Sequence, residues 1–287
     1  MVFKVFLEVM PMDKQKKIRS GIIFIAITIL LIVGIILTKD DSAEESIQLV
    51  MKDAVLHETG KISLFGLLEV NPGLISAYTV TAILIIFAAV VRVFVIPKFS
   101  YNPGKFQILL ETLVDLFNGL AKSNSPHRNS FLGAYVFAAG TYIFTGTCFE
   151  LFGFQAVTTL GGSIALPAPL ADINGAISLG VMSYMVILGG GIIGNGFKGV
   201  LNTLKDFSLP ISMSFRLFGA LLSGALVTEL VYYYSIVSYG FPVLVGVMFT
   251  LLHALIQAYV LTMLTALFYG EVSEPAPKKE KVRRKKK

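Results

Sequence analysis

The chain has 287 residues, of which 55% are hydrophobic and only 15% are charged, and its mean hydropathy is +0.75. Soluble globular chains carry about 25% charged residues, so this composition excludes a water-soluble domain and indicates a protein that crosses a membrane several times. The net charge is +6, but the basic residues gather near both chain ends beside apolar segments, which membrane topology explains and which excludes a nucleic-acid-binding protein.

Cysteine and histidine content excludes two further classes of site. The single cysteine, Cys148, excludes an intrachain disulfide framework and a cysteine-rich metal site. The three histidines, His57, His127 and His253, are too scattered to form a metal cluster. We therefore expect neither a metal nor any other cofactor.

Six apolar stretches are long enough to cross a bilayer, which takes about 20 residues each. They cover approximately residues 20–38, 73–96, 131–153, 173–195, 208–234 and 241–269. The sequence therefore predicts an all-α polytopic membrane protein with about six transmembrane helices.

The first stretch, 20–38, follows a basic cluster that favours a cytoplasmic start (Lys14, Lys16, Lys17 and Arg19). We interpret it as an uncleaved anchor, because no clear small-x-small cleavage site follows Ile36 and Leu37. A cleaved signal peptide is the alternative. The acidic segment 39–61 then suits the extracytoplasmic side.

The segment 103–122 differs from the spans, because its apolar residues recur at helical spacing with charges between them. This pattern predicts an amphipathic helix that lies at the cytoplasmic interface. A short re-entrant helix is the alternative. Arg92, before this segment, is interpreted as an anchor whose side chain reaches the interface.

Basic residues fall on one side of the predicted topology throughout, so both termini are expected in the cytoplasm. The chain divides into an N-terminal anchor with a polar extracytoplasmic segment (1–70), a membrane domain (71–270) and a basic cytoplasmic tail (271–287). The tail is expected to be solvated and to contact anionic lipid. No inverted internal repeat, the mark of many secondary transporters, is evident.

Arg216 lies in an apolar run of the fifth span, where nothing nearby in the sequence neutralises it. The next acid is Glu229, thirteen residues on, or about 20 Å along a helix. A guanidinium stays charged at biological pH, and its placement at bilayer depth costs roughly 2.5 kcal/mol or more. A partner for this charge is therefore expected.

Small residues share a helical face with Arg216, at spacings of three, four, seven, eight and eleven. They are Ser212, Gly219, Ala220, Ser223, Gly224 and Val227. Small residues let a second helix approach closely in a membrane, so this face is suited to a partner helix. The alternative is ordinary packing within the chain, with Arg216 bonded to carbonyls or to a buried carboxylate.

The sixth span carries a polar stripe at spacings of four, three and four, formed by Gly246, Thr250, His253 and Gln257. The fifth and sixth spans are antiparallel, and counting from their short loop brings Gln257 to the depth of Arg216. Gln257 can then orient the guanidinium without neutralising it. His253 alone is explained as a satisfied buried histidine, whereas the stripe favours a hydrated path.

Polar groups near the outer face are candidates for the lining of an aqueous cavity that stops before Arg216. They are Glu150 at the end of the third span, Asp172 and Asn174 at the start of the fourth, and Glu229 on the fifth. Simple solvation at the interface is the alternative for each of them.

Two blocks of sequence resemble subunit a of F-type ATP synthases. The first is Ser-Phe-Arg-Leu-Phe-Gly at 214–219 with Ser223-Gly224, and the second is the segment 255–267 around Gln257. Weaker agreement occurs at 103–107, 149–151 and 171–174. The resemblance covers roughly residues 70–270, which makes the first span an addition to a five-span core with a long tilted helical hairpin at its end.

The resemblance implies an ion-translocating stator subunit that is not an enzyme by itself. Such a subunit sits beside a ring of c subunits, with subunit b of the peripheral stalk and the other ATP synthase subunits as partners. Two half-channels lead to the ring carboxylates, and Arg216 matches the arginine that separates them, with Gln257 in support. The implied ion pathway includes Glu150, Asp172, Asn174, Ser212, Ser223, Glu229, Thr250 and His253.

This chain departs from the family pattern at three positions that are usually polar: Ala220, Ala225 and Thr250. Glu229 and His253 lie one helical turn from vacant positions, and we expect them to take over part of the polar lining. They cannot form a contacting pair, because their levels on antiparallel helices differ by roughly 10 Å or more.

Two other functions remain as alternatives. An autonomous secondary transporter or ion channel needs an ion-binding acid near Arg216 in this chain, and none is apparent. A structural scaffold leaves the arginine unexplained. The bacterial plasma membrane is the expected location, with an organellar inner membrane as the alternative; the sequence leaves open the choice of proton or sodium and the direction of operation.

Overall fold

The computed structural model describes residues 21–26, 28–29, 33, 61–64, 68–159, 161–233 and 241–275. Five helices in this part are long and apolar enough to cross a membrane: Pro72–Lys98, Ser130–Phe152, Ile173–Asn195, Ser208–Thr228 and Gly246–Ser273. They confirm the all-α polytopic class and the five predicted core spans. The predicted first span, 20–38, lies outside the described residues except for a few helical positions.

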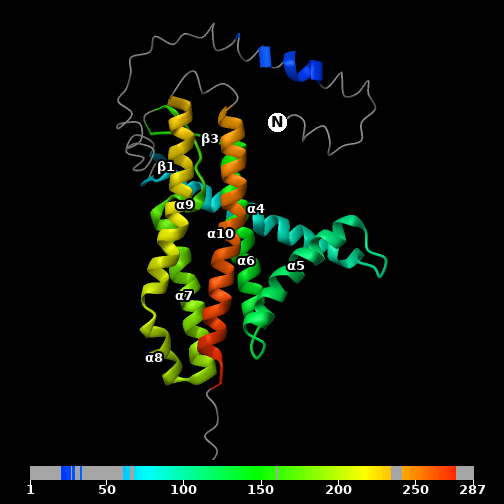
Figure 1. Ribbon diagram of the computed structural model, residues 1–287, viewed down its shortest axis with the longest axis vertical. Coiled ribbons are helices and arrows are strands. Elements are labelled where there is room, and N and C mark those ends of the chain that lie inside the picture. Colours follow the sequence, from blue (N-terminus) through cyan, green and yellow to red (C-terminus); the bar gives the residue numbers. More distant parts are fainter. Residues whose placement is uncertain are drawn as a thin grey trace, which may run out of the picture.

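The helices follow one another along the chain, and the connection between α6 and α7 is a long one that holds a β-hairpin (Figure 1). They are α4 (Pro72–Val90), α5 (Lys105–Asn124), α6 (Ser130–Phe149), α7 (Ile173–Asn195), α8 (Phe197–Lys205), α9 (Ser208–Tyr233) and α10 (Phe241–Ser273). One π turn, Val91–Val95, and a 3-10 turn, Ile96–Lys98, extend α4. A further 3-10 turn, Glu150–Phe152, follows α6.

The sequence predicted α5 but missed three smaller features. Helix α8 lies between the fourth and fifth spans, where the sequence analysis assigned no element, and it begins after Gly196, whose φ of 58° reverses the chain. Two antiparallel hairpins were also missed: β1 (Ile62–Leu64) with β2 (Leu68–Val70), and β3 (Gln155–Val157) with β4 (Ser163–Ala165). The amide of Thr159 donates to the Lys61 carbonyl at 3.0 Å and so joins the two hairpins.

Helix α7 packs against α8, α9 and α10 through positions that have no side chain. A Cβ on Gly180 would lie 3.0 Å from the Pro210 carbonyl oxygen of α9, and one on Gly194 would lie 2.6 Å from the Ser273 carbonyl oxygen of α10. Close approach of this kind is how helices gain packing energy in a membrane. Large apolar side chains fill the remaining core, with Leu132, Ile143, Ile187, Met213 and Leu217 almost completely buried.

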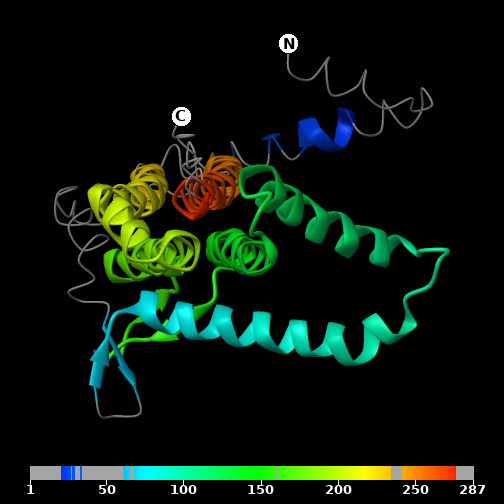
Figure 2. The same ribbon diagram turned by 90° about the horizontal axis from the view of Figure 1, so that it is seen from below.

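Helix α4 runs across the other helices rather than along them. Figure 2 views α6, α7, α9 and α10 nearly end-on, while α4 and the returning α5 are seen lengthwise. The 33 residues of α10 make a rod of about 50 Å, which exceeds the roughly 30 Å hydrocarbon core. Helix α10 is therefore long enough to cross the membrane at a tilt.

Candidate functional site

Arg216 lies on the outward face of α9. Ser212, Gly219 and Ser223 share this exposed face with it. The opposite face packs against α7, because Met213, Ser214 and Leu217 are buried there and the Ser214 hydroxyl donates to the Pro210 carbonyl at 2.7 Å. The charge and the small residues of α9 therefore point outward, away from α7.

The small-residue face is open within the described part of the chain. A Cβ added at Gly219 of α9 would have no heavy atom within 4 Å, whereas a Cβ at Gly180 of α7, which packs against α9, would collide with the Ser214 hydroxyl. Intrachain packing therefore does not explain the lack of a side chain at Gly219. The face has the shape that a partner helix needs.

Arg216 makes no hydrogen bond or ion pair with any residue that the structure describes. Ser223, two turns further along the same face, donates to the Ala220 carbonyl at 2.8 Å instead. An arginine in an apolar setting without a counter-charge is costly. The missing carboxylate is consistent with a partner outside this part of the chain, and it disfavours an autonomous transporter.

Helix α10 brings His253 against α9. The imidazole Nδ1 lies 2.9 Å from the Phe249 carbonyl oxygen, and a Cβ on Gly224 would be 3.7 Å from the same nitrogen. Gly224 lies two turns beyond Arg216. Since the helices are antiparallel, Gln257, one turn past His253, approaches the level of Arg216 to within about one turn, or about 6 Å.

Gln257 is buried, with 5% of its surface exposed. The structure contains no hydrogen bond between Gln257 and Arg216 across the described segments, so their pairing stays a prediction. Thr250 lies one turn from His253 on the side away from Gln257 and is partly exposed. The glycine of the same stripe, Gly246, has open space where its side chain would be.

The predicted outer polar groups occupy a different part of the molecule. Asp172 caps α7, because its Oδ1 accepts from the Asn174 amide at 3.0 Å and from the Asn174 side chain at 3.2 Å. Both residues line a cavity between α4, α5, α6 and α7, to which neither α9 nor α10 contributes a lining residue. Glu150 lies half-buried after α6. Glu229 lies on α9, and its side chain is outside what the structure describes.

Sequence analysis missed residues that position α9 and α10. Gly180, Gly190 and Gly194 let α7 approach the two helices closely, and their small-residue spacing on the fourth span was a signal for this role. Asn195 holds the end of α10 through hydrogen bonds to two backbone carbonyls. No sequence pattern pointed to this contact, because its partners are nearly eighty residues apart.

Comparison with known proteins places this arrangement in a family. Residues 75–270 match the family model described as ATP synthase A chain. The chain is 25% identical over 236 residues to the ATP synthase subunit a of Haemophilus influenzae (strain PittEE), covering 70% of this chain and 90% of that protein. It is 27% identical over 214 residues to the ATP synthase subunit a of Mannheimia succiniciproducens, covering 64% of this chain and 82% of that protein.

Proposed function

This chain belongs to the ATP synthase A chain family, and we propose that it acts as the ion-translocating stator subunit beside a rotating ring of c subunits. As a family member it is a non-catalytic, multi-pass subunit of the membrane sector of ATP synthase, with the role of a proton channel. The proposal adds how ions reach and leave the ring, and which residues of this chain take part.

One observation carries the proposal: Arg216 is exposed on a small-residue face and has no partner among the residues described. A ring carboxylate that approaches this face supplies the missing counter-charge. At low dielectric the attraction between the two charges is strong, so the carboxylate loses its ion as it reaches Arg216. The same fixed positive charge prevents ions from passing directly between two half-channels.

Gln257 and the polar stripe are proposed to complete the site. Gln257 holds the guanidinium toward the ring from the neighbouring helix. The ion path is proposed to include Glu150, Asp172, Asn174, Ser212, Ser223, Glu229, Thr250 and His253. The contact of His253 with Gly224 supports its place between α9 and α10, close to the family positions that Ala220 and Ala225 leave without a polar group.

The proposed setting is the bacterial plasma membrane, with both termini in the cytoplasm and the c-ring, subunit b and other ATP synthase subunits as partners. Bacterial relatives support this location. Residues 71–270 form the membrane domain, residues 1–70 the added anchor and outer segment, and residues 271–287 the basic tail. Either protons or sodium ions fit this scheme, because the ring carboxylate belongs to another chain.

The Arg216→Ala substitution tests the proposal. We expect the complex to assemble but to lose coupled ATP synthesis, because nothing then drives ion release from the ring or blocks leakage. ATP synthesis driven by an ion gradient in reconstituted vesicles is the measurement, and the amount of assembled complex is measured beside it.

Lys98→Ala is the matched control, because it removes an exposed cation at the end of α4. It should leave coupled synthesis intact. Coupled synthesis that survives in Arg216→Ala contradicts the proposal. Ion transport by the purified chain alone, without copies of a c subunit and an ATPase head, would support an autonomous transporter instead.

A further inference from the structure

The outward surface of α10 carries one hydroxyl within a long apolar stripe. Between Leu244 and Leu267, the exposed residues that the structure describes are apolar except for Tyr259, which is 57% exposed. The Tyr259 carbonyl accepts from the Thr262 hydroxyl at 3.0 Å, but the Tyr259 phenol makes no hydrogen bond within the described part of the chain. A hydroxyl without a partner is costly in an apolar setting, so a partner from outside this part of the chain is expected.

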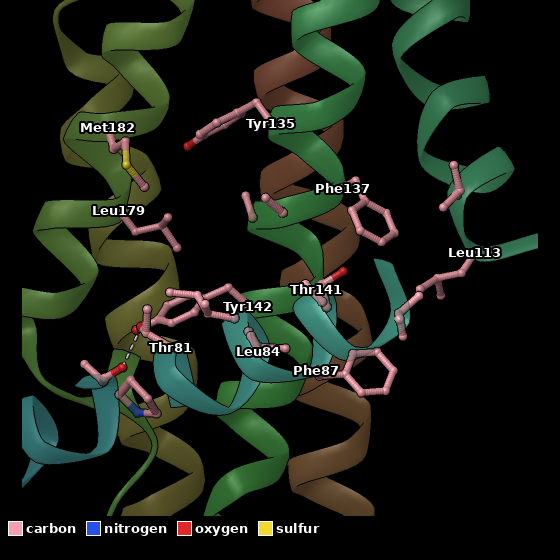
Figure 3. Close-up of a pocket in the computed structure, with 18 of the residues that line it drawn as sticks. Thr81, Leu84, Phe87, Leu113, Tyr135, Phe137, Thr141, Tyr142, Leu179 and Met182 are labelled. Atoms are coloured by element: carbon pink, nitrogen blue, oxygen red, sulfur yellow. Dashed lines mark hydrogen bonds between the residues drawn. The ribbon is translucent and has the colours of Figure 1, made fainter. Parts of the chain in front are cut away.

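The tyrosines of α6 differ from Tyr259, because they face other parts of the chain. The Tyr135 hydroxyl lies 2.8 Å from the Ser183 hydroxyl of α7. Figure 3 shows Tyr135 and Tyr142 pointing from α6 into the cavity that this helix forms with α4, α5 and α7. Packing within the chain therefore explains these two side chains, but it does not explain Tyr259.

Tyr259 points away from the core of the bundle. Residues two apart on a helix point in nearly opposite directions, because each residue turns by about 100°. Gln257 and Leu261, two residues to either side, are both buried, so Tyr259 lies on the opposite side of α10. Figure 2 shows α9 (yellow) beside α10 (orange to red), and α6 (green) between α10 and α4 (cyan). Since Arg216 points away from α7, Arg216 and Tyr259 lie on one outward surface of the α9–α10 pair.

Tyr259 also lies at the level of Arg216. The contact between His253 and Gly224 sets the relative height of the two helices, since a Cβ on Gly224 would be 3.7 Å from the imidazole Nδ1. From this contact, Arg216 is about 12 Å along α9 and Tyr259 is about 9 Å along α10. Because the helices are antiparallel, both distances run the same way, and the two levels differ by about 3 Å. Gln257 stops about 6 Å short of the arginine.

The two side chains lean in opposite directions from this common level. Long side chains on a helix lean toward its N-terminal end. In the proposed topology the N-terminal end of α10 faces the outside, and that of α9 faces the cytoplasm. The Tyr259 hydroxyl is therefore on the outer side of the Arg216 guanidinium, beside the outer path to which His253 is assigned.

We propose that Tyr259 is a further residue of the ion-transfer site, where it donates a hydrogen bond to each ring carboxylate at the outer half-channel. This inference rests on the proposed function. The phenol keeps its proton, and its O–H stabilises the ionised carboxylate when the ion leaves for the outer path, because hydrogen bonds to charged groups are strong. In ATP-driven pumping the carboxylate releases its ion here before it passes Arg216. In ATP synthesis it takes up an ion here.

Tyr259→Phe in the assembled complex removes the hydroxyl and keeps the ring. We expect ATP-driven ion pumping into reconstituted vesicles to fall about tenfold, or about 1.4 kcal/mol, because ion release loses its hydrogen-bond donor. Gradient-driven ATP synthesis should fall less. A pH-sensitive dye and radioactive sodium follow the pumping, so that either ion is detected. Tyr78→Phe is the matched control, because it removes a similarly exposed hydroxyl from α4, and it should leave both rates near wild type.

Unchanged pumping in Tyr259→Phe overturns the inference, and so does an equal loss in both directions, which a disturbed ring contact would cause. A photoreactive residue at position 259 gives an independent measurement. An adduct with a c subunit supports the inference, whereas an adduct with lipid or with another polypeptide overturns it. The proposed function is tested separately by Arg216→Ala, so it stands if Tyr259→Phe has no effect while Arg216→Ala abolishes coupled synthesis.

Discussion

Two glycines of neighbouring helices show how single residues separate folding from function in this molecule. Gly180 of α7 touches the backbone of α9, where a Cβ would lie 3.2 Å from the Ser214 amide nitrogen, while Gly219 of α9 faces open space. The lack of a side chain at Gly180 is explained by packing within the chain. The same lack at Gly219 has no such explanation, and it points to the proposed ring.

The substitution Gly219→Leu tests that distinction. We expect the subunit to fold and insert normally, because the new side chain meets nothing in the described chain, but ATP synthesis by the complex should fall severely as the ring is pushed from Arg216. Gradient-driven ATP synthesis and thermal unfolding in detergent are the measurements.

Gly189→Leu is the matched control, since this α7 glycine also has open space around it. It should leave ATP synthesis near wild type. Gly180→Ala should instead lower the stability by about 1–3 kcal/mol through overpacking. If Gly219→Leu supports normal synthesis, the small face has no close partner.

Helix α10 is fixed at its C-terminal end by two other elements. The Asn195 side chain, at the end of α7, donates to the carbonyls of Val272 at 3.0 Å and Glu274 at 2.7 Å. His127, in the connection between α5 and α6, lies 2.9 Å from the Ser273 hydroxyl through Nε2. Carbonyls at a helix end lack partners within the helix, so these contacts hold the element that carries Gln257.

The substitution Asn195→Ala removes both of its hydrogen bonds to α10. Each such bond contributes about 0.5–1.5 kcal/mol, so we expect a loss of stability of about 1–3 kcal/mol and a lower midpoint of thermal unfolding in detergent. Asn202→Ala is the control, because Asn202 is exposed on α8 and only accepts from Lys205 at 3.4 Å. Equal midpoints of thermal unfolding for the two variants would show that the Asn195 hydrogen bonds contribute nothing to stability.

The arrangement of the whole molecule sets the tilt of the C-terminal hairpin. Figures 1 and 2 agree that α4 crosses the direction of α6, α7 and α10. Helix α4 and the bundle of α6, α7 and α10 therefore cannot both stand perpendicular to the membrane plane. Since α10 is about 50 Å long and the hydrocarbon core about 30 Å thick, we expect α10 to incline together with α9, so that Gln257 and Arg216 lie on sloping helices.

Depth measurements on α10 test this tilt. Met248 and Leu267 are both exposed and lie about 28 Å apart along the helix. If about 50 Å of helix fits within about 30 Å, their depths should differ by only about 17 Å. Fluorophores on cysteines at the two positions, in a Cys148→Ser background, report depth by quenching in the reconstituted complex. A difference near 28 Å would mean an upright helix.

The sequence by itself determined the class of the protein and the five core helices, and it predicted a role for Arg216. Apolar runs of this length form transmembrane helices, because a helix satisfies its backbone hydrogen bonds within the segment. A permanently charged residue within such a run can be recognised from the sequence alone. The predicted bounds 173–195 agree with α7, because these signals are local. The sites of the ion pathway stay predictions.

Only the tertiary structure decided which faces of these helices are covered. It left the face of Arg216 open, set His253 against Gly224 and turned α4 across the bundle to open the cavity beside Arg92. The two β-hairpins and α8 also appeared only here, since each is too short to carry a periodic signal. Contacts between distant segments depend on how whole helices pack, and no local pattern of residues specifies that.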